Sequence, residues 1–256
     1  MLKLITHIHP PYTTDGWNNP DNILKYAIKK RVYVELDPHN SLLWTRAHHE
    51  AFTSEYVIAG IELGLMGTDV IAVGENLSEL ARDKRFPIFD RKVKRMLDVS
   101  FEEGIEILRR IGIEYICLPH PTCICGAAKN GYDKDQLSKA DAIEVWNGSI
   151  SFIPIRYNQE ALILAEKLNK PKIAGVDGHI GLSSLDSCYN LVDATCKEEI
   201  YEAIKKGRTT PHISSLYPFQ LLRDYTVMAF SVARDVLTAK LKISPSDFTS
   251  STKQLY

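Results

Sequence analysis

The stretch KLITHIHP, residues 3–10, joins a short apolar run to two histidines separated by one residue. Side chains of a strand alternate between its two faces, so this spacing puts His7 and His9 on the same side. Together with residues 3–6, seven later apolar runs of similar length predict eight strands. They are VYVEL (32–36), YVIAGI (56–61), DVIAVG (69–74), EYICL (114–118), AIEVW (142–146), KIAGV (172–176) and NLVDA (190–194).

Helical patterns separate several of these runs. Residues 20–30 begin with Pro20 and Asp21, which suit the first turn of a helix, and carry apolar residues on one face. Near-continuous apolar strands separated by helices indicate a parallel sheet covered on both faces. The pattern fits a closed β/α barrel, and an open doubly wound sheet shows the same alternation. Further helices are predicted over 101–111, 157–168 and 197–206.

The character of the sequence changes after Arg208. The segment TTPHISSLYP (209–218) is rich in turn residues, and residues 218–238 carry apolar side chains at helical intervals. We therefore expect a barrel over residues 1–212 and a helical extension over residues 213–256 that packs on it. The apolar stripe over 218–238 would serve this packing or a contact between subunits of an oligomer.

Charge and composition narrow the classes of partner. The 256 residues have a net charge of −1 and a pI near 6.7, so no global field attracts long nucleic acid or an anionic membrane. No apolar run approaches the roughly 20 residues of a membrane span, and the first residues do not form a secretory signal. The 5 cysteines fit reduced thiols better than a disulfide framework. These features predict a cytoplasmic protein.

Residues that bind metals follow five of the predicted strands. In parallel β/α folds the carboxyl ends of the strands converge on one face, where active sites are built. Imidazole together with carboxylate favours Zn, Mn or Fe over Mg or Ca, and so many ligands exceed the needs of one tetrahedral zinc. We therefore expect two or three divalent ions. The residues are His7 and His9, Asp37 and His39, Glu62, His120, and Asp177 and His179.

In these motifs the chain resembles the PHP family, named for its polymerase and histidinol phosphatase members. The matching motifs keep the family's order: HIHPPYTTDG (7–16), LDPHN (36–40), GIELG (60–64), LPHP (118–121), IEVWNG (143–148) and GVDGH (175–179), and Asn158 matches as well. The resemblance implies a distorted seven-stranded (β/α)7 TIM-like barrel, with Glu62 bridging two metal ions. The metal ligands that it implies are His7, His9, Asp15, His39, Glu62, His120, Asp177 and His179.

The sequence departs from the family pattern at several places. Thr6 and Pro10 stand where the family usually has Asp before the first histidine and Thr after the second. Pro38 separates an aspartate and a histidine that are adjacent in the family, and this insertion could move His39. Asp69 stands where the family often has a histidine, so a third ion would be bound more weakly or selected differently.

The ligand pattern and the resemblance predict hydrolysis of phosphomonoesters or small nucleotides by a hydroxide that bridges the metal ions. Asp37 and His179 are the candidate catalytic residues, and Asp37 would orient a ligand histidine. Lys129 and Arg156 are candidates for binding the phosphate of a small phosphorylated substrate, although surface solvation explains them equally well. The expected ligand groups are His7, His9, Glu62 and Asp177; Asp15, His39 and His179; and His120 and Glu62, with Asp69 assisting.

Three other functions compete with this prediction. An exonuclease acting on short oligonucleotides is permitted by the resemblance. A non-catalytic metal-binding module would keep the same ligands without turnover. Hydrolysis of C–N bonds by a related barrel would call for a bridging lysine after a strand, and none is found there.

Several other residues have simple structural interpretations. His48 and His49 lie in a helical stretch and are expected at the surface. Cys123 and Cys125 follow His120 and could offer thiolates to zinc, but small buried residues are the simpler interpretation. Trp17 and Trp44 could stack on a base, and packing in the core or at the rim is the simpler interpretation.

Overall fold

A computed structural model of the protein describes residues 1–11, 16–90, 96–123, 126–149, 156–179 and 181–213, together with Thr226. The chain divides into two compact units, Met1–Leu216 and Tyr217–Tyr256. Apart from Ile213 and Thr226, the predicted helical extension over 213–256, with its stripe over 218–238, lies outside the described residues. The domain boundary after residue 212 stays a prediction.

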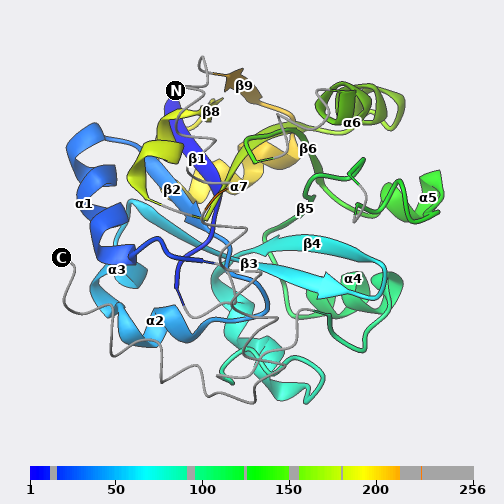
Figure 1. The fold of residues 1–256 in the computed structure, drawn as a ribbon, viewed down its shortest axis with the longest axis horizontal. Coiled ribbons are helices and arrows are strands. Elements are labelled where there is room, and N and C mark those ends of the chain that lie inside the picture. Colours follow the sequence, from blue (N-terminus) through cyan, green and yellow to red (C-terminus); the bar gives the residue numbers. More distant parts are fainter. Residues whose placement is uncertain are drawn as a thin grey trace. The chain divides into compact units, whose positions relative to one another are not determined.

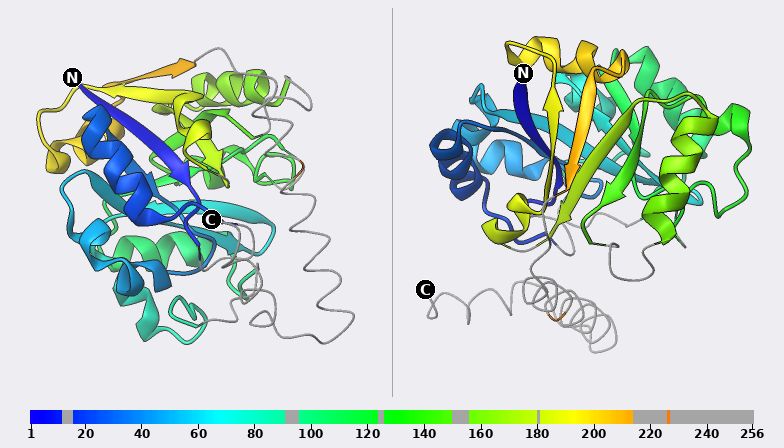
Figure 2. Two further views of the ribbon diagram at one scale, coloured as in Figure 1. Left: turned by 60° about the vertical axis from the view of Figure 1, so that its left-hand side comes forward. Right: turned by 90° about the horizontal axis from the view of Figure 1, so that it is seen from above.

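Seven strands of the described residues close into a barrel. Figure 1 labels these strands, and Figure 2 gives two further views of their arrangement. The ring closes because β1 pairs in parallel with both β2 and β7. This confirms the predicted distorted β/α barrel and excludes the open sheet. In sheet order the strands are β1 (Leu2–Ile8), β2 (Tyr33–Leu36), β3 (Val57–Leu65), β4 (Thr68–Val73), β5 (Tyr115–Leu118), β6 (Ala142–Asn147) and β7 (Lys172–Gly178).

The direction of β4 distorts the barrel. β3 and β4 form a hairpin whose turn includes Gly67 at φ 85°, and β4 also runs antiparallel to β5. The expectation of a parallel sheet is therefore wrong at β4, because the two residues between β3 and β4 cannot form the long crossover that parallel strands need. Glu62 consequently lies within β3, opposite Ile71, and not at a strand end.

Two further strands extend the sheet outside the ring. β8 (Cys188–Val192) pairs antiparallel with the first residues of β1, and β9 (Thr209–Ile213) pairs antiparallel with β8. β9 covers residues for which the sequence predicted a turn. Pro211 and its polar neighbours hid the strand, but β9 is last in the sheet order, and an edge strand tolerates a residue that lacks an N–H.

The main helices begin and end close to the predicted positions: α1 (Pro20–Lys30), α4 (Phe101–Arg110), α6 (Arg156–Lys167) and α7 (Lys197–Lys205). The side chain of Asn19 caps α1 by accepting hydrogen bonds from the backbone N–H groups of Asp21 and Asn22 at 3.0 and 3.1 Å. Among the described residues, no helix combines the length and apolar character needed to cross a membrane. The shorter helices are α2 (Leu43–Ala47), α3 (His49–Thr53), α5 (Lys134–Leu137) and the 3-10 helices η1 (Glu75–Arg82) and η2 (Leu182–Asp186).

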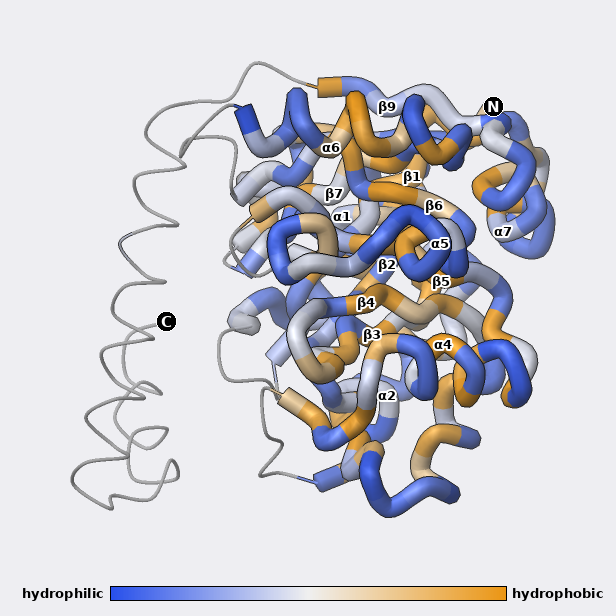
Figure 3. Tube along the Cα trace, turned by 90° about the vertical axis from the view of Figure 1, so that its right-hand side faces the viewer, coloured by the Kyte–Doolittle hydropathy of each residue, from blue (hydrophilic) through white to orange (hydrophobic). Residues whose placement is uncertain are grey.

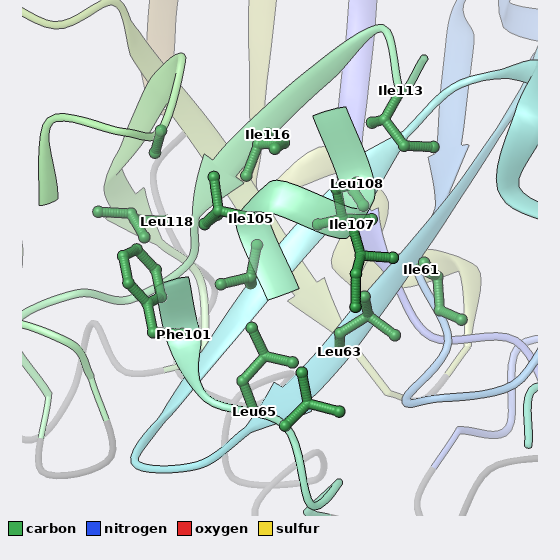
Figure 4. Packing of buried hydrophobic residues seen from close by; sticks show 14 of the residues in the cluster. Ile61, Leu63, Leu65, Phe101, Ile105, Ile107, Leu108, Ile113, Ile116 and Leu118 are labelled. Atoms are coloured by element: carbon green, nitrogen blue, oxygen red, sulfur yellow. The ribbon is translucent and has the colours of Figure 1, made fainter. Parts of the chain in front are cut away.

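The outer core lies between the strands and the covering helices. Figure 4 shows Leu63 and Leu65 of β3 gathered with Ile105 and Leu108 of α4, all of them buried. A Cβ at Gly104 would lie 2.6 Å from Leu65 Cδ1, so the close approach of α4 needs a glycine there. In Figure 3 the chain is largely hydrophobic along β1 and β4 and hydrophilic on α5, as expected of a covered barrel.

The side chains inside the barrel change from apolar to polar along its axis. Near the amino ends of the strands, Leu4 of β1 and Ile173 of β7 pack with Ile200 of α7 in one buried apolar cluster. Further along, Glu35 of β2 and Glu144 of β6 are each only 2% exposed. The barrel is therefore closed by apolar side chains at one end and becomes polar towards the other, where the candidate ligands lie.

Candidate metal centre

The predicted ligands that the structure describes converge at the carboxyl-terminal end of the barrel. All of them are buried or nearly so, although they come from six different parts of the sheet. Asp15 is the one predicted ligand that lies outside the described residues. The others are His7 and His9 from β1 and its end, His39 after β2, Glu62 in β3, Asp69 in β4, His120 after β5, and Asp177 and His179 at the end of β7.

The carboxylate of Glu62 lies at the centre of this cluster. Its Oε2 is 3.4 Å from His7 Nε2, 3.5 Å from His9 Nε2 and 2.9 Å from His39 Nδ1. Its Oε1 is 3.0 Å from His120 Nε2. One carboxylate thus meets four imidazoles with two different oxygens, which is the geometry that a bridging ligand requires.

A second carboxylate, Asp177, lies on the other side of His9. Asp177 Oδ1 is 3.1 Å from His9 Nε2 and 3.7 Å from His7 Nε2. The His9 ring stacks on the rings of both His39 and His179, with centroids 4.5 and 4.2 Å away, and the centroids of those two rings are 6.2 Å apart. Nδ1 of His179 is 3.0 Å from the Asp177 carbonyl oxygen, which can only accept, so Nδ1 is the donor and Nε2 is left to act as a ligand.

Backbone strain is concentrated at the same residues. His7, His120 and Asp177 have φ angles of 63°, 29° and 47°, a region that residues other than glycine rarely adopt. Around His7 the register of β1 shifts against both β2 and β7, as in a bulge. Such strain persists only where the surrounding structure enforces it, and it clusters at functional sites.

The donor set fits divalent cations. Four groups of three side chains in the described residues have ligand atoms within 4.8 Å of one another. His7 Nε2 is buried without a hydrogen-bond partner although Glu62 Oε2 lies 3.4 Å away, and a cation between the two atoms would bind both. The groups are His9, His39 and His179; His7, His120 and Asp177; His7, His9 and Glu62; and Glu62, Asp69 and His120.

The protonation states of the cluster follow from burial and from neighbouring charges. Burial, together with the rings of His179 and His39, lowers the pKa of His9 to about 3. Burial would also lower the pKa of His7, but the carboxylates of Glu144, Asp177 and Glu62 outweigh it and raise that pKa well above the usual value. The pKa of Glu62 stays well below its usual range, because His39 and His7 outweigh its burial. The ring of His7 therefore carries the proton that a bound cation would replace.

The insertion of Pro38 does not remove His39 from the cluster. The carbonyl oxygen of Pro38 accepts a hydrogen bond from the Glu62 N–H at 3.0 Å, and His39 and Glu62 form a parallel bridge. The chain after β2 thus stays paired with β3 beyond the end of β2, through the bridge between His39 and Glu62. This pairing brings His39 Nδ1 to Glu62.

Two solved structures share the fold at low sequence identity. PsfC from Pseudomonas syringae has a TM-score of 0.60 and 16% identity, covering 92% of this chain and 98% of that one. A candidate metal-dependent phosphoesterase from Bifidobacterium adolescentis has a TM-score of 0.53 and 14% identity, covering 78% of this chain and 94% of that one. No curated protein is a significant match.

A family model described as PHP-associated matches residues 156–209, from α6 to the start of β9. The resemblance to the PHP family is confirmed. The matched segment contains Asp177 and His179, two of the described members of the cluster. Together with the histidine and carboxylate donors, these findings support a metal-dependent hydrolase.

The predicted phosphate-binding residues do not join the PHP-like cluster. Lys129 Nζ is 2.9 Å from Glu160 Oε2, and Arg156 Nε is 3.1 Å from Glu160 Oε1. Both side chains are exposed at the surface beside α6, where a glutamate that the sequence analysis did not consider holds them. Their role in binding phosphate stays a prediction.

Asp37 lies beneath the cluster and not among its rings. Its Oδ2 accepts a hydrogen bond from the backbone N–H of His7 at 3.0 Å, so it holds the main chain of a ligand and not its imidazole. Burial and the nearby Glu35 raise the pKa of Asp37 well above its usual value. Its catalytic role stays a prediction.

The remaining singled-out residues divide between core, surface and rim. His48 is bound to Asp21 at 2.8 Å, away from the cluster, and Trp44 is fully buried. Cys123 is buried with Sγ 3.5 Å from His120 Nδ1, whereas Cys125 lies outside the described residues. Trp17 is 48% exposed, and its backbone N–H donates to the carbonyl oxygen of His179, so it lies at the rim.

Two residues that hold the cluster were given no role in the sequence analysis. Glu144 and Asn147 belong to IEVWNG, which was recognised only as a motif of the PHP family. Asn147 Nδ2 donates to Glu144 Oε2 at 2.9 Å and to Asp177 Oδ2 at 3.1 Å. Their signal in the sequence was a carboxylate and an amide inside an otherwise apolar strand.

Proposed function

We propose that this protein hydrolyses phosphomonoesters or small nucleotides with the help of two or three divalent cations, with Zn, Mn or Fe as the candidates. The observation that carries the proposal is the contact of both Glu62 oxygens with four imidazoles. A buried carboxylate shared among so many nitrogen donors suits adjacent cations better than any purely structural role.

The ligands would divide around Glu62. His7, His9, Glu62 and Asp177 would hold one cation, and His39 and His179, with Asp15, a second. Glu62, His120 and Asp69 would hold a third. When bound, such ions lower the pKa of coordinated water and offset charge on a phosphoryl group.

The protein's own residues prepare the site for this chemistry. His9 is neutral at ordinary pH because of its low pKa, so its ring is available as a ligand. His179 donates its Nδ1 proton to the Asp177 carbonyl, which fixes the ring and leaves Nε2 towards the cluster. Lys129 and Arg156 are engaged by Glu160, so phosphate charge would be balanced mainly by cations.

Turnover of phosphate esters tests the proposal. Protein loaded with Mn or Zn should hydrolyse p-nitrophenyl phosphate or members of a nucleotide panel. His9→Ala should lower kcat/KM by roughly 100-fold or more, on the scale of losing one electrostatic contributor to the transition state. His48→Ala, which removes a histidine bound to Asp21, is the matched control and should retain activity.

Two outcomes would count against the proposal. One is folded, metal-loaded protein without turnover on any phosphate ester, which would favour a non-catalytic module. The other is faster cleavage of a short oligonucleotide than of a mononucleotide bisphosphate, which would favour an exonuclease.

A further inference from the structure

Glu144 lies directly below the cluster, at a position where it cannot itself bind a cation without breaking existing contacts. It is in β6 and only 2% exposed. Its Oε1 is 2.7 Å from His7 Nδ1, and its Oε2 accepts from the backbone N–H of His120 at 2.7 Å and from Asn147 Nδ2 at 2.9 Å. Both oxygens are thus engaged, and the four ligand groups found in the described residues do not include Glu144.

The contact with His7 determines which ring nitrogen faces the cluster. An ionised carboxylate only accepts hydrogen bonds, so His7 Nδ1 must carry a proton. The opposite nitrogen, Nε2, is then directed to Glu62 Oε2 at 3.4 Å and Asp177 Oδ1 at 3.7 Å. Glu144 thereby makes Nε2 the ligand atom of His7.

The second oxygen of Glu144 acts on a different ligand. His120 has a strained backbone, with φ at 29°, and its N–H is held by Glu144 Oε2. Asn147 joins the same oxygen to Asp177. One carboxylate therefore connects ligands that enter the site from β1, from the end of β5 and from β7.

The neighbouring strand leaves space for this arrangement. A Cβ at Gly175 of β7 would lie 1.8 Å from Glu144 Oε1 and 2.9 Å from His7 Cβ. Any side chain at residue 175 would therefore expel the carboxylate from its contact with His7. The glycine of the GVDGH motif makes room for the hydrogen bond.

We propose that Glu144 is a positioning residue for the metal centre, which fixes the tautomer of His7 and the backbone of His120 so that both can bind cations. The proposal rests on the metal site of the proposed function. It goes beyond that function because it assigns a role to a residue that touches neither substrate nor metal. Carboxylates that orient ligand histidines typically contribute 10–100-fold to metal affinity.

Glu144→Gln tests the proposal with little change of shape. His7 Nδ1 and the His120 N–H contact different oxygens of Glu144, and glutamine replaces one of these oxygens with an NH2 donor, so one of the two hydrogen bonds is lost. We expect the affinity for Mn, measured by equilibrium dialysis and elemental analysis, to fall about 10–100-fold. For Glu144→Asp, which keeps the charge but shortens the side chain, we expect a smaller loss of affinity for Mn. Thermal unfolding of the metal-free variants checks that they fold.

A second measurement separates positioning from a mere loss of negative charge. In long-range ¹H–¹⁵N spectra of the zinc-loaded protein, wild type should show a protonated Nδ1 and a zinc-bound Nε2 at His7. Glu144→Gln should broaden or remove the Nδ1–H signal. Glu35→Gln, measured at pH 8 where Glu35 is ionised, removes a buried negative charge on β2. It is the matched control and should leave both the signal and the affinity unchanged.

The outcomes are distinguishable. If wild type binds no Mn or Zn, the proposed metal centre is wrong, and so is the role proposed for Glu144. If wild type binds metal and Glu144→Gln binds it equally well, the centre stands and the role of Glu144 is overturned. An equal loss of affinity in Glu35→Gln would also overturn it, since the effect would then belong to the charge of the barrel interior.

Discussion

At the scale of single residues, His7 and His9 differ in protonation although only one residue separates them. Both are fully buried, and burial lowers the pKa of each ring. His9 stacks on two other imidazoles and stays neutral, whereas His7 is surrounded by three carboxylates that raise its pKa. The two rings of one His-x-His motif are thus prepared differently for a cation.

This difference predicts that metal binding releases a proton. Near pH 7 the raised pKa keeps His7 protonated in the metal-free protein, and Nε2 must lose that proton to bind a cation. His9, Glu62 and Asp177 contribute none, because each is already deprotonated. Calorimetric titration with Mn in buffers of different ionisation enthalpy should therefore report the release of at least one proton, the one from His7. Binding heats that are independent of the buffer would contradict this.

At the scale of elements, the close approach of β2 and β3 depends on a missing side chain. A Cβ at Gly60 of β3 would lie 1.9 Å from Asp37 Oδ1 and 3.2 Å from Val73 Cγ2. Asp37 cannot easily withdraw, since its other oxygen holds the N–H of His7. The glycine therefore keeps three neighbouring strands, β1, β2 and β3, in register near the site.

Gly60→Ala should accordingly destabilise the protein by about 1–3 kcal/mol, the usual cost of overpacking a buried position. Urea unfolding monitored by circular dichroism measures this. Because the clash is with Asp37, the double variant Gly60→Ala/Asp37→Ala should lose less stability than the sum of the single changes. Strict additivity of the two substitutions would show that the clash is relieved in another way.

The elements also show what a sequence can predict. Apolar runs that end in histidines, such as residues 3–9, predict the strands and the strand ends that carry ligands, because each pattern lies within one short stretch of sequence. The sequence did not reveal that β4 runs antiparallel, although this reversal brings Asp69 to the same end of the barrel as Glu62. Nor did it reveal β9, because Pro211 resembles a turn residue until its pairing with β8 is known.

For a similar reason, local sequence patterns could not predict which residues hold the ligands of the cluster in place. Glu144 meets His7 and His120 only after the barrel has closed, across 137 and 24 residues of chain. A buried carboxylate between apolar residues is visible in AIEVW, but its partners depend on sheet order and register. The same applies to Lys129 and Arg156, whose ion pairs with Glu160 depend on the folded structure.

At the scale of the whole molecule, the barrel holds a layer of buried acids below the cluster. Glu35 accepts a hydrogen bond from the hydroxyl of Tyr115 and lies two residues from Asp37, whose charge it influences. Burial raises the pKa of Glu35 to about 7, and burial together with Glu35 raises the pKa of Asp37 well above its usual value. The folded barrel thus retains protons that the unfolded chain would release, and its stability is linked to pH.

The sign of this linkage gives a prediction for Glu35→Gln. The folded pKa of Glu35 is raised from 4.5 to about 7, so its favourable contribution is fully present below pH 4.5 and is lost as the pH rises through 7. A neutral glutamine avoids that loss, which is on the order of 3 kcal/mol for such a shift. The free energy of unfolding of the variant minus that of wild type should therefore be more positive at pH 8 than at pH 5.

Urea unfolding in EDTA at both pH values measures this difference, with Glu50→Gln on the exposed face of α3 as a control for charge. If this difference in unfolding free energy is the same at both pH values, Glu35 is ionised inside the barrel. That result would contradict the raised pKa of Glu35.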